Sequence, residues 1–503
     1  RSYSVTGVQT CALPILEGLA DRTVYTDAVT FTITPEAGYD CGARLGAVEL
    51  PLTQSVTIDS PDYYELELFA TNRLTSEVSE RRIQFIVRDA GRGTSEVGLP
   101  AWTPHPLIPS APEELAGGGL ELVLPPVFPA GLEIPVVARL WTAGGSALRA
   151  NGAVQAEGQP PIVMRRGVGS GFLAAGAAGE TVRYAGGMGT LSQVKTVMIE
   201  PETTWTTVAG ELSGVVDWPE DVRIAVDGTL TVTAGSVLRV GAGSVIRLAG
   251  GADLVIDGVM LVEGTLERPV VFLPADVTEP WGGFLVRGEG ARVEASGAIF
   301  TGSGANADWF EENPGYAVHR QEQALFLIDE AEVALTNCFA MRHAGQFGHG
   351  KDARLTLDGC LVQRFVTGGE YNGGSVRVYR SALIEFPEDS AAFDDADNDA
   401  IYFTTGTHEI RDTLIGWAKD DGIDHGSGGA GTMVVSNCWV EACFHEAFAW
   451  SGGGRVVRME DNVCLNNGQG IEAGYSTGSD SPRVRGSLFA SKPIELVGAS
   501  LVD

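Results

Sequence analysis

Acidic side chains recur at matching intervals in the last third of the chain. Asp421 lies 22 residues after Asp399, and Glu446 lies 25 residues after Asp421. If these positions stack, their carboxylates are about 5 Å apart and repel, so one must be protonated or a cation must bridge them. We expect acid–base chemistry or a calcium site here, the alternative being side chains that extend into water and bind nothing. The candidate metal ligands are Asp399, Asp421, Asp424 and Glu446.

Neighbouring residues supply the other groups that such a site uses. Asp420 precedes Asp421 and His445 precedes Glu446, so proton donors and acceptors share the repeated segment. The candidate catalytic residues are Asp399, Asp420, Asp421 and His445. Exposed aromatic rings can bind sugar rings, and a histidine beside a carboxylate titrates in the working range, although burial of the aromatic rings in the core is the competing interpretation. The candidate substrate-binding residues are Tyr402, Trp450, Lys419 and His425.

These intervals belong to a repeat with two registers. Three-residue motifs that end in a hydrophobic residue follow one another at spacings of 24, 30, 22, 25 and 23 residues. A second series, from Asn337-Cys338 to Gly486-Ser487, runs in phase with the first and includes Ser381-Ala382 and Asn462-Val463. Two registers of one period indicate a stack of similar units, each in contact mainly with its neighbours. The first series is Gly345-Gln346-Phe347, Gly369-Glu370-Tyr371, Asp399-Ala400-Ile401, Asp421-Gly422-Ile423, Glu446-Ala447-Phe448 and Gln469-Gly470-Ile471.

Short strands separated by Gly and Asp turns begin near residue 224. The segments 228–232, 236–240 and 244–248 follow one another at intervals of about eight residues. A three-sided coil of parallel strands needs about 20–25 residues per rung, in agreement with the repeat. The sequence therefore predicts an all-β chain in which residues 206–503 form a right-handed parallel β-helix. Residues 302–323 break the period and are predicted to protrude as a loop.

On these strands the chain resembles the right-handed parallel β-helix proteins of secreted bacterial origin, the pectin-lyase-like fold shared by pectate lyases and polygalacturonases. The order Asp397-Asn398-Asp399, Asp420-Asp421 and His445 is similar to the order of polygalacturonase motifs. The resemblance implies that Asp421 protonates the leaving oxygen and that His445 supports the site. It also implies that Asp399 and Asp420 orient the attacking water.

Two features depart from that pattern. The polygalacturonase Gly-His-Gly is Phe444-His445-Glu446 here, and the family's Arg-x-Lys substrate clamp has no counterpart. A calcium-dependent lyase would need a basic residue to abstract a proton, and Lys419 is a nearby candidate for that role. Hydrolase and lyase therefore both stay open as readings of the same segment.

Two smaller β modules are predicted before the coil. Residues 16–97 have alternating apolar and polar strands, and they resemble the immunoglobulin- or fibronectin-like β-sandwich modules of bacterial secreted hydrolases. A proline-rich linker is predicted over residues 98–117 and a second β-sandwich over 118–205. Residues 1–15 resemble a translated sequencing adapter joined to a metagenomic fragment, so we expect the true N-terminus to be missing and the C-terminus to be truncated.

Composition narrows the range of partners. The chain has 34 basic and 65 acidic residues, a formal net charge of −31. The basic stripe that neutralises nucleic-acid phosphates is absent, and anionic membranes are disfavoured for the same reason. No apolar run reaches the ~18–20 residues of a membrane-spanning helix. We expect a protein that is secreted or lies on the cell surface.

The cysteines also follow the repeat. Cys338, Cys360 and Cys438 fall in one column of the second register, and no cysteine has the C-x-x-C or Cys/His spacing of a zinc site. We expect free thiols packed as small apolar groups inside the stack, with disulfides between rungs as the alternative.

The function expected from these observations is recognition of an extended polymer, a polysaccharide in particular, along a face of the coil, with calcium as a bridging ion. One alternative is a polysaccharide-degrading enzyme, either a polygalacturonase-like hydrolase or a calcium-dependent lyase. Another alternative is a structural spacer on the cell surface. An enzyme requires a groove over the acidic columns, a binder requires exposed aromatic rings, and a spacer requires only a flat polar face.

Overall fold

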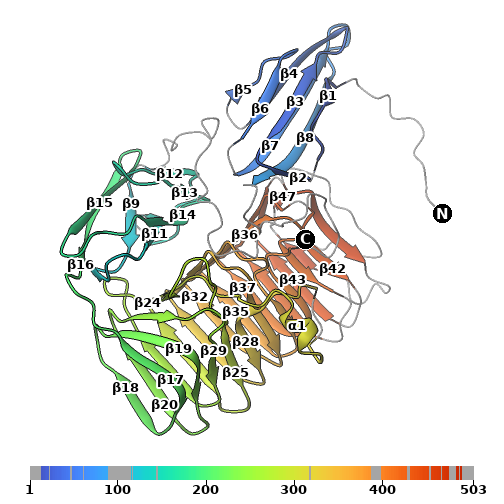
Figure 1. The fold of residues 1–503 in the computed structure, drawn as a ribbon. Coiled ribbons are helices and arrows are strands. Elements are labelled where there is room, and N and C mark those ends of the chain that lie inside the picture. The colour runs from blue at the N-terminus through green and yellow to red at the C-terminus, as the bar shows by residue number, and fades with distance from the viewer. Residues whose placement is uncertain are drawn as a thin grey trace. The chain divides into compact units, whose positions relative to one another are not determined.

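The chain is built almost wholly from β-strands in this computed structural model (Figure 1). The structure describes all residues except 1–12, 22, 46–47, 60–61, 89–114, 116, 143–144, 317–318, 387–397, 427–430, 444, 452–454, 466, 475–482, 486–487 and 490–503. Most of the predicted linker and of residues 1–15 therefore lies outside the described residues. Within the described part, no helix is long and apolar enough to cross a membrane. The prediction of an all-β chain is confirmed.

The N-terminal unit is a β-sandwich of two sheets. One sheet has the order β1-β3-β6 and the other the order β2-β8-β7-β4-β5. Alternate residues of β3, namely Val29, Phe31 and Ile33, share one core with Leu66 of β7 and Phe85 of β8. The strands are β1 (Ile15–Glu17), β2 (Thr23–Thr26), β3 (Val29–Thr34), β4 (Tyr39–Leu45), β5 (Val48–Glu49), β6 (Ser55–Ile58), β7 (Asp62–Asn72) and β8 (Val78–Arg88).

The second module consists of small sheets. Two three-stranded sheets have the orders β14-β11-β9 and β10-β16-β15, and β12 pairs with β13. Its buried residues include Leu122, Val136, Val154 and Tyr184. The strands are β9 (Gly118–Val123), β10 (Val127–Phe128), β11 (Ile134–Thr142), β12 (Gly152–Val154), β13 (Ile162–Met164), β14 (Val168–Leu173), β15 (Thr181–Met188) and β16 (Leu191–Ile199).

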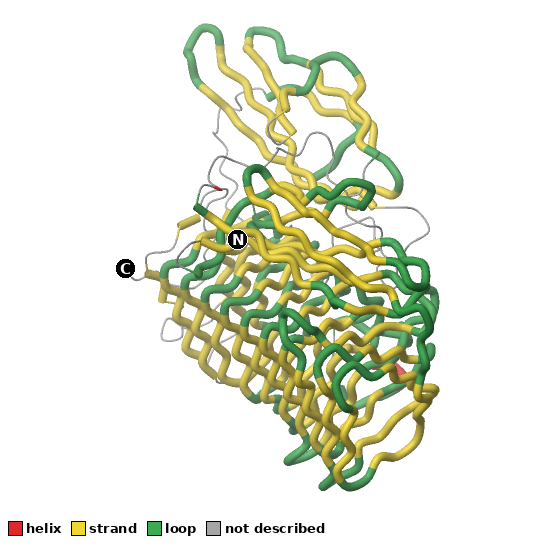
Figure 2. The backbone as a smooth tube through the Cα atoms, turned by 90° about the vertical axis from the view of Figure 1, so that its left-hand side faces the viewer, coloured by secondary structure: helices red, strands yellow, loops and turns green. Residues whose placement is uncertain are grey.

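From β17 (Thr206–Leu212) onward the chain forms a parallel β-helix, a coil with three faces whose strands stack as ladders (Figure 2). In each rung the chain passes from face B through face C to face A, and each strand pairs in parallel with its equivalent one rung later. The predicted fold class, a parallel β-helix after two β modules, is confirmed.

Face A comprises the start of β19 (Arg223–Val232), β21 (Val245–Leu248), β24 (Val270–Pro274), β27 (Ala298–Phe300), β30 (Phe339–Met341), β33 (Leu361–Gln363), β36 (Ala382–Phe386), β38 (Leu414–Ala418), β41 (Trp439–Glu441), β44 (Val463–Leu465) and β47 (Leu488–Phe489). Face B comprises the end of β19, β22 (Leu254–Ile256), β25 (Phe284–Arg287), β28 (Ala324–Asp329), β31 (Gln346–Lys351), β34 (Glu370–Asn372), the start of β37 (Tyr402–Arg411), β39 (Ile423–His425), β42 (Glu446–Ser451) and β45 (Gln469–Gly474). Face C comprises β18 (Val215–Trp218), β20 (Val237–Gly241), β23 (Val259–Glu263), β26 (Arg292–Ser296), β29 (Glu332–Thr336), β32 (Arg354–Asp358), β35 (Ser375–Tyr379), the end of β37, β40 (Gly431–Ser436), β43 (Arg455–Glu460) and β46 (Arg483–Arg485).

Like side chains stack inside the coil, because the parallel register repeats each inward position one rung later. The ring of Phe284 lies on that of Phe326 with 4.9 Å between centroids, and Phe272 lies on Phe300 at 5.1 Å. Stacked rings of this kind add about 0.5–1.5 kcal/mol per pair beyond the apolar area they bury. A single apolar cluster runs through the coil from Trp218 to Ile471.

Single residues in the left-handed backbone conformation make two corners of the coil. Their φ angles lie between 47° and 66° at the corner from face C to face A, and between 50° and 62° at the corner from face A to face B. Residues other than glycine seldom adopt this conformation, and Asn and Asp adopt it most readily. The first column is Asn337, Gly359, Arg380, Asp412, Asn437 and Asp461, and the second is Arg342, Arg364, Glu385, Trp417 and Ala442.

The first of these columns corrects the predicted second register at two points. Arg380-Ser381 and Asp461-Asn462 are the equivalents of Asn337-Cys338, one residue earlier than predicted. The shared column of Cys338, Cys360 and Cys438 is confirmed, and the described cysteines are free thiols.

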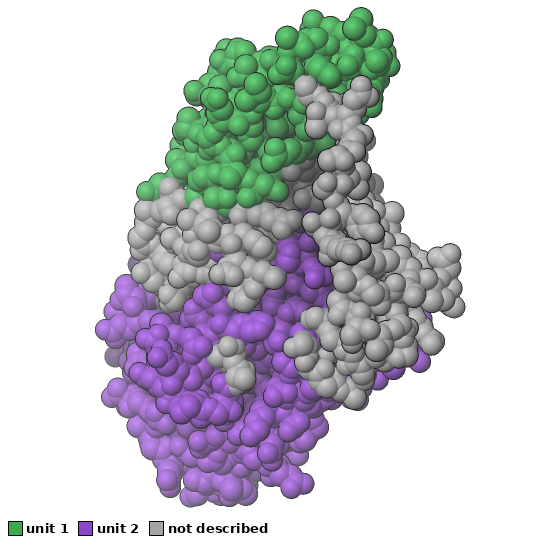
Figure 3. Space-filling model, turned by 90° about the vertical axis from the view of Figure 1, so that its right-hand side faces the viewer, with its two compact units in different colours: residues 1–90, 102–110, 390–392 green, residues 91–101, 111–389, 393–503 purple. Residues whose placement is uncertain are grey.

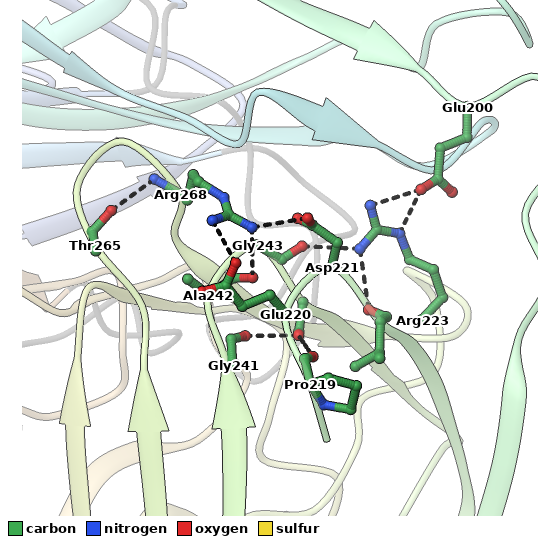
Figure 4. Close-up of polar contacts among 12 residues, drawn as sticks. Glu200, Pro219, Glu220, Asp221, Arg223, Gly241, Ala242, Gly243, Thr265 and Arg268 are labelled. Carbon is green, nitrogen blue, oxygen red and sulfur yellow. Dashed lines mark hydrogen bonds and ion pairs between the residues drawn. The ribbon is translucent and has the colours of Figure 1, made fainter. Parts of the chain in front are cut away.

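The second module packs along face A and belongs with the coil to one compact unit (purple in Figure 3), while the N-terminal sandwich forms the other. Strands β30, β33, β36 and β38 are buried at every position, because the coil interior covers one side and the module covers the other. At the beginning of the coil, Arg223 donates hydrogen bonds to Glu200, which follows β16, and to the carbonyl oxygens of Val222 and Gly243 (Figure 4).

Two arginines of the second module bind carboxylates on different rungs of the coil. Arg165 Nε lies 3.0 Å from Glu385 Oε1, and Arg364 of the coil lies 2.9 Å from the other oxygen of the same carboxylate. Two rungs further along, Arg166 Nε lies 2.5 Å from Glu441. Glu385 is fully buried, and burial alone would raise its pKa, but Arg364 and Arg165 outweigh burial and hold that pKa below its ordinary value.

We predict that Glu385→Ala destabilises the unit by ~3–5 kcal/mol, because it leaves two buried guanidinium groups without their carboxylate. The matched control is Glu332→Ala, whose ion pair with Arg354 is about half exposed and should contribute less than ~1 kcal/mol. Urea unfolding of the whole chain measures both. Equal shifts in the two midpoints would contradict the prediction.

The interruption at residues 302–323 lies against face B, which corrects the prediction that it protrudes. It contains α1 (Trp309–Glu312), and the ring of Phe310 lies 4.5 Å from that of His349 on β31. The backbone amides of His319 and Arg320 donate to the two oxygens of Glu370 at 2.8 and 2.9 Å. Burial raises the pKa of Glu370 to about 8, although these amides act in the opposite direction.

The raised pKa of Glu370 predicts a pH dependence. Its folded value of about 8 lies above the ordinary value of 4.5, so the folded state binds more protons between these pH values. Stability should therefore fall as pH rises from about 4.5 to 8, with a slope of at most ~1.4 kcal/mol per pH unit from this group. Glu370→Gln should remove that slope in urea unfolding across the window, and an unchanged slope would refute the assignment.

Candidate functional site

The strand pairings place the predicted site residues in vertical columns. Tyr402 pairs with Asp424, Asp424 with Ala449, and Ala449 with Glu472. The column beside it runs from Phe403 through His425 and Trp450 to Ala473. Both columns continue the repeat that the sequence shows. The acidic residues thus come from the corner between faces A and B and from the first residues of face B.

One earlier motif is out of register. Glu370 pairs with Tyr402 and Tyr371 with Phe403, two residues away from the alignment that the motif Gly369-Glu370-Tyr371 predicts. The spacing of 30 residues to the next motif, against 22 to 25 later in the chain, is the signal of this insertion. Glu370 therefore belongs to the column of Tyr402 and Asp424.

Asp399, Asp421 and Glu446 form a ladder along the corner. Asp399 Oδ1 accepts a hydrogen bond of 3.1 Å from the amide of Asp421, and Asp421 Oδ1 accepts one of 2.7 Å from the amide of Glu446. The carboxylates of Asp399 and Asp421 thereby each bind the backbone one rung further along. All three residues are at most 4% exposed. Part of the acidic column therefore has a structural role, which fixes the next rung.

His445 lies close to three carboxylates, those of Asp420, Asp421 and Glu446. Its Nδ1 lies 2.5 Å from Glu446 Oε2, 3.3 Å from Asp420 Oδ1 and 3.4 Å from Asp421 Oδ1. The His445 side chain is 13% exposed, whereas those of the carboxylates are 1–6% exposed. We call Asp399, Asp420, Asp421, His445 and Glu446 the acidic cluster. Its histidine is the member most open to solvent.

Burial and mutual repulsion shift the acidities of the cluster. Burial, followed by the charges of Asp420, Asp424 and Asp421, raises the pKa of Asp399 well above its ordinary range. Burial and Asp421 raise the pKa of Glu446 to about 9 against the opposing effect of His445. Burial alone would lower the pKa of His445, but its three carboxylate neighbours raise it to about 12. The cluster therefore retains protons at neutral pH unless another cation replaces them.

Two groups of potential metal ligands occur among the described residues, each with donor atoms within 4.8 Å of one another. One is Asp420, Asp421 and His445, and the other is His445, Glu446 and Glu472. Asp421 and Glu446 are predicted ligands that belong to these groups, while Asp399 and Asp424 belong to neither. The carboxylate oxygens suit calcium, and an imidazole nitrogen suits manganese or zinc better.

Three of the four predicted substrate-binding residues have buried side chains. Lys419 and His425 are fully buried, and Trp450 is 1% exposed with its ring stacked on Phe448. Tyr402 is half-buried, and its ring lies 4.1 Å from that of His319 in the inserted loop. In this structure, only Tyr402 of the four presents surface to a polymer. Asp397 and Phe444, which the polygalacturonase comparison also uses, lie outside the described residues.

Two groups beside the cluster were not among the candidate site residues. Glu472 lies in the same column as Asp424 and belongs to the second group of potential metal ligands. The repeat spacing in the sequence could have identified it. Gln469 Nε2 lies 3.5 Å from His445 Nε2, on the rung after Glu446. Comparison with known proteins adds no assignment, because neither a family model nor a curated protein matches the chain.

Removal of the imidazole should destabilise the coil. We expect His445→Ala to cost on the order of 3 kcal/mol in chelator-containing buffer, because three carboxylates lose their shared cation. Since the folded pKa of about 12 exceeds the ordinary 6.5, the advantage of the wild type should shrink as pH rises from 6.5 toward 12. Urea unfolding at several pH values measures this difference. Lys351→Ala, which removes an exposed cation, is the control and should change little; an equal loss in both variants would contradict the role of His445.

Proposed function

We propose that the coil recognises an extended polymer outside the cell, a polysaccharide in the first place, and that the acidic cluster holds a divalent cation needed for that recognition. The observation that carries the proposal is the convergence of Asp420, Asp421 and Glu446 on His445 from two neighbouring rungs. Buried carboxylates this close require protons or a cation. A bound cation would satisfy them and would leave coordination positions toward the partly exposed side of His445.

The surface beside the cluster supports binding of a long ligand. Tyr402, Asp424 and Glu472 lie in one column of face B, where equivalent positions on adjacent rungs are about 4.8 Å apart, and all three are partly exposed. A polymer that follows the coil axis would meet these groups in succession. Its own oxygen atoms could complete the coordination of calcium, which takes six to eight oxygen ligands.

A hydrolase is the second candidate, because the raised pKa values of Asp399 and Glu446 supply the protonated carboxyl group that a general acid needs. Against it, both side chains are buried, and the carboxylate of Asp399 is engaged in the corner ladder. His445 is the most exposed member of the cluster, and Asp421 is the most exposed of its carboxylates. The enzyme proposal therefore depends on Asp421 and requires turnover that Asp421→Asn abolishes.

The cation proposal predicts thermal stabilisation of the wild-type chain. Calcium at about 100 times its Kd should stabilise the folded state by ~2.7 kcal/mol, and the Tm should rise accordingly. Glu446→Gln should lose most of this shift, whereas Glu332→Gln on face C should keep it. Manganese and zinc are tested in parallel because His445 contributes nitrogen. A Tm that none of the three ions changes would overturn the cation site.

Polymer recognition is tested on immobilised acidic and neutral polysaccharides, with and without chelator. We expect the wild type to be retained more strongly without chelator than with it, and Glu446→Gln to show no such difference. Release of reducing ends or unsaturated products, absent in Asp421→Asn, would instead establish the enzyme. A chain that neither binds nor cleaves any polysaccharide would leave the spacer as the function.

A further inference from the structure

A cleft of about 930 Å³ lies between the second module and the corner of the coil from face C to face A. This is at the upper end of the ~300–1,000 Å³ typical of ligand sites. The coil contributes the left-handed corner column described above, together with the first residues of the face A strands. The module contributes residues of β9, β11 and the segments 145–149 and 166–168. The acidic cluster lies at a different corner.

The cleft is elongated along the coil axis. Its lining includes Phe339, Leu361, Ala382, Trp439 and Val463, which belong to one ladder of paired face A positions. That ladder passes through Leu414 between Ala382 and Trp439, so it covers five steps of about 4.8 Å, or roughly 24 Å. A cleft of this length fits a chain of several linked units better than a compact small molecule.

Charge in the cleft differs from that of the protein. Although the chain carries −31 overall, the lining contains four arginines beside the three carboxylates of Glu121, Asp412 and Asp461. Two of these arginines pair with carboxylates outside the lining. Arg139 is paired with Glu121, Arg166 with Glu441 and Arg380 with Asp358. In the part of the chain that the structure describes, Arg149 makes no hydrogen bond or ion pair. Burial, the largest influence, lowers the pKa of Arg149 from its ordinary value, while the charges of Cys438 and Asp412 act in the opposite direction. The half-buried guanidinium of Arg149 is therefore partly withdrawn from water, where an anion would stabilise it.

Two tryptophans line the same cleft as this arginine. Trp141, on β11, is 42% exposed, and its indole lies against Gly119, where a Cβ would come within 2.2 Å of the ring. Trp439 is half-buried, with the guanidinium of Arg166 4.7 Å from its ring centroid. An exposed indole offers a flat apolar surface with a polar edge, which suits the C–H face of a sugar ring. A peptide with acidic side chains would not need that surface.

We propose that this cleft binds an anionic oligosaccharide, with Arg149 pairing with a carboxylate or sulfate and Trp141 stacking on a sugar ring. The proposal concerns a second site and does not depend on the cation at the acidic cluster. Carboxylate and sulfate groups share the chemistry that a guanidinium recognises, since both accept two parallel N–H hydrogen bonds.

The test is the affinity of the full chain for labelled oligosaccharides in chelator-containing buffer, where the proposed cation site is empty. Polyuronate, sulfated and neutral oligosaccharides of equal length, and a polyglutamate peptide, are the probes. We expect binding of at least one anionic oligosaccharide and at least tenfold weaker binding of the neutral one. Arg149→Ala and Trp141→Ala should each weaken binding about tenfold or more, consistent with loss of one charge-assisted contact.

Controls separate this site from the proposed function. Arg354→Ala, which removes an exposed arginine on face C, should bind as the wild type does. Arg149→Lys should recover part of the affinity, and thermal unfolding should show the same Tm for all cleft variants. Absence of binding to every anionic oligosaccharide, unchanged affinity in Arg149→Ala, or equal binding of polyglutamate would overturn the proposal. Loss of binding on chelation alone would assign the interaction to the acidic cluster instead.

Discussion

Parallel pairing between successive rungs is the constraint on which the rest of the structure depends. Each strand pairs with its equivalent one rung later, so every side chain has a fixed neighbour at about 4.8 Å. For Phe284 and Phe326 this produces favourable ring stacking. For Asp399, Asp421 and Glu446 it produces repulsion among buried carboxylates. The same geometry therefore stabilises the interior of the coil and creates a set of buried carboxylates that needs a counter-charge.

The acidic cluster combines structural and chemical roles in the same side chains. Asp399 and Asp421 use one oxygen each to bind the amide of the next rung, which holds the corner in register. Asp420, Asp421 and Glu446 also surround His445, the member with the greatest exposure. The same carboxylates therefore maintain the register of the corner and supply the charge of the cluster.

Periodicity made the coil and the acidic columns predictable. Intervals of 22 and 25 residues between Asp399, Asp421 and Glu446 correctly implied vertical neighbours, since a parallel coil repeats with its rung length. The left-handed corners at Arg380 and Trp417 were not predictable in the same way, because neither residue type favours positive φ and only the repeated fold imposes it. The two-residue shift at Glu370 escaped detection because Gly-Glu-Tyr matches the motif by composition.

Contacts between segments far apart in sequence were beyond the reach of pattern analysis. Arg149 and Arg166 belong to a module that precedes the coil, and nothing in their local sequence indicates Trp439 or Glu441 as neighbours. Burial of Lys419, His425 and Trp450 was likewise undecidable, since residues of a short strand alternate between interior and surface and a bend can reverse that alternation.

The arginine contacts of the second module have a consequence for how the coil unfolds. A solenoid whose rungs touch only their neighbours behaves as a one-dimensional array that can fray from either end. Here Glu133, Arg165 and Arg166 of one module bind Arg342, Glu385 and Glu441, which lie on different rungs. A rung in this span cannot open without also breaking the docking of the module. The middle of the solenoid is thereby joined into a cooperative block, and fraying is confined to rungs outside it.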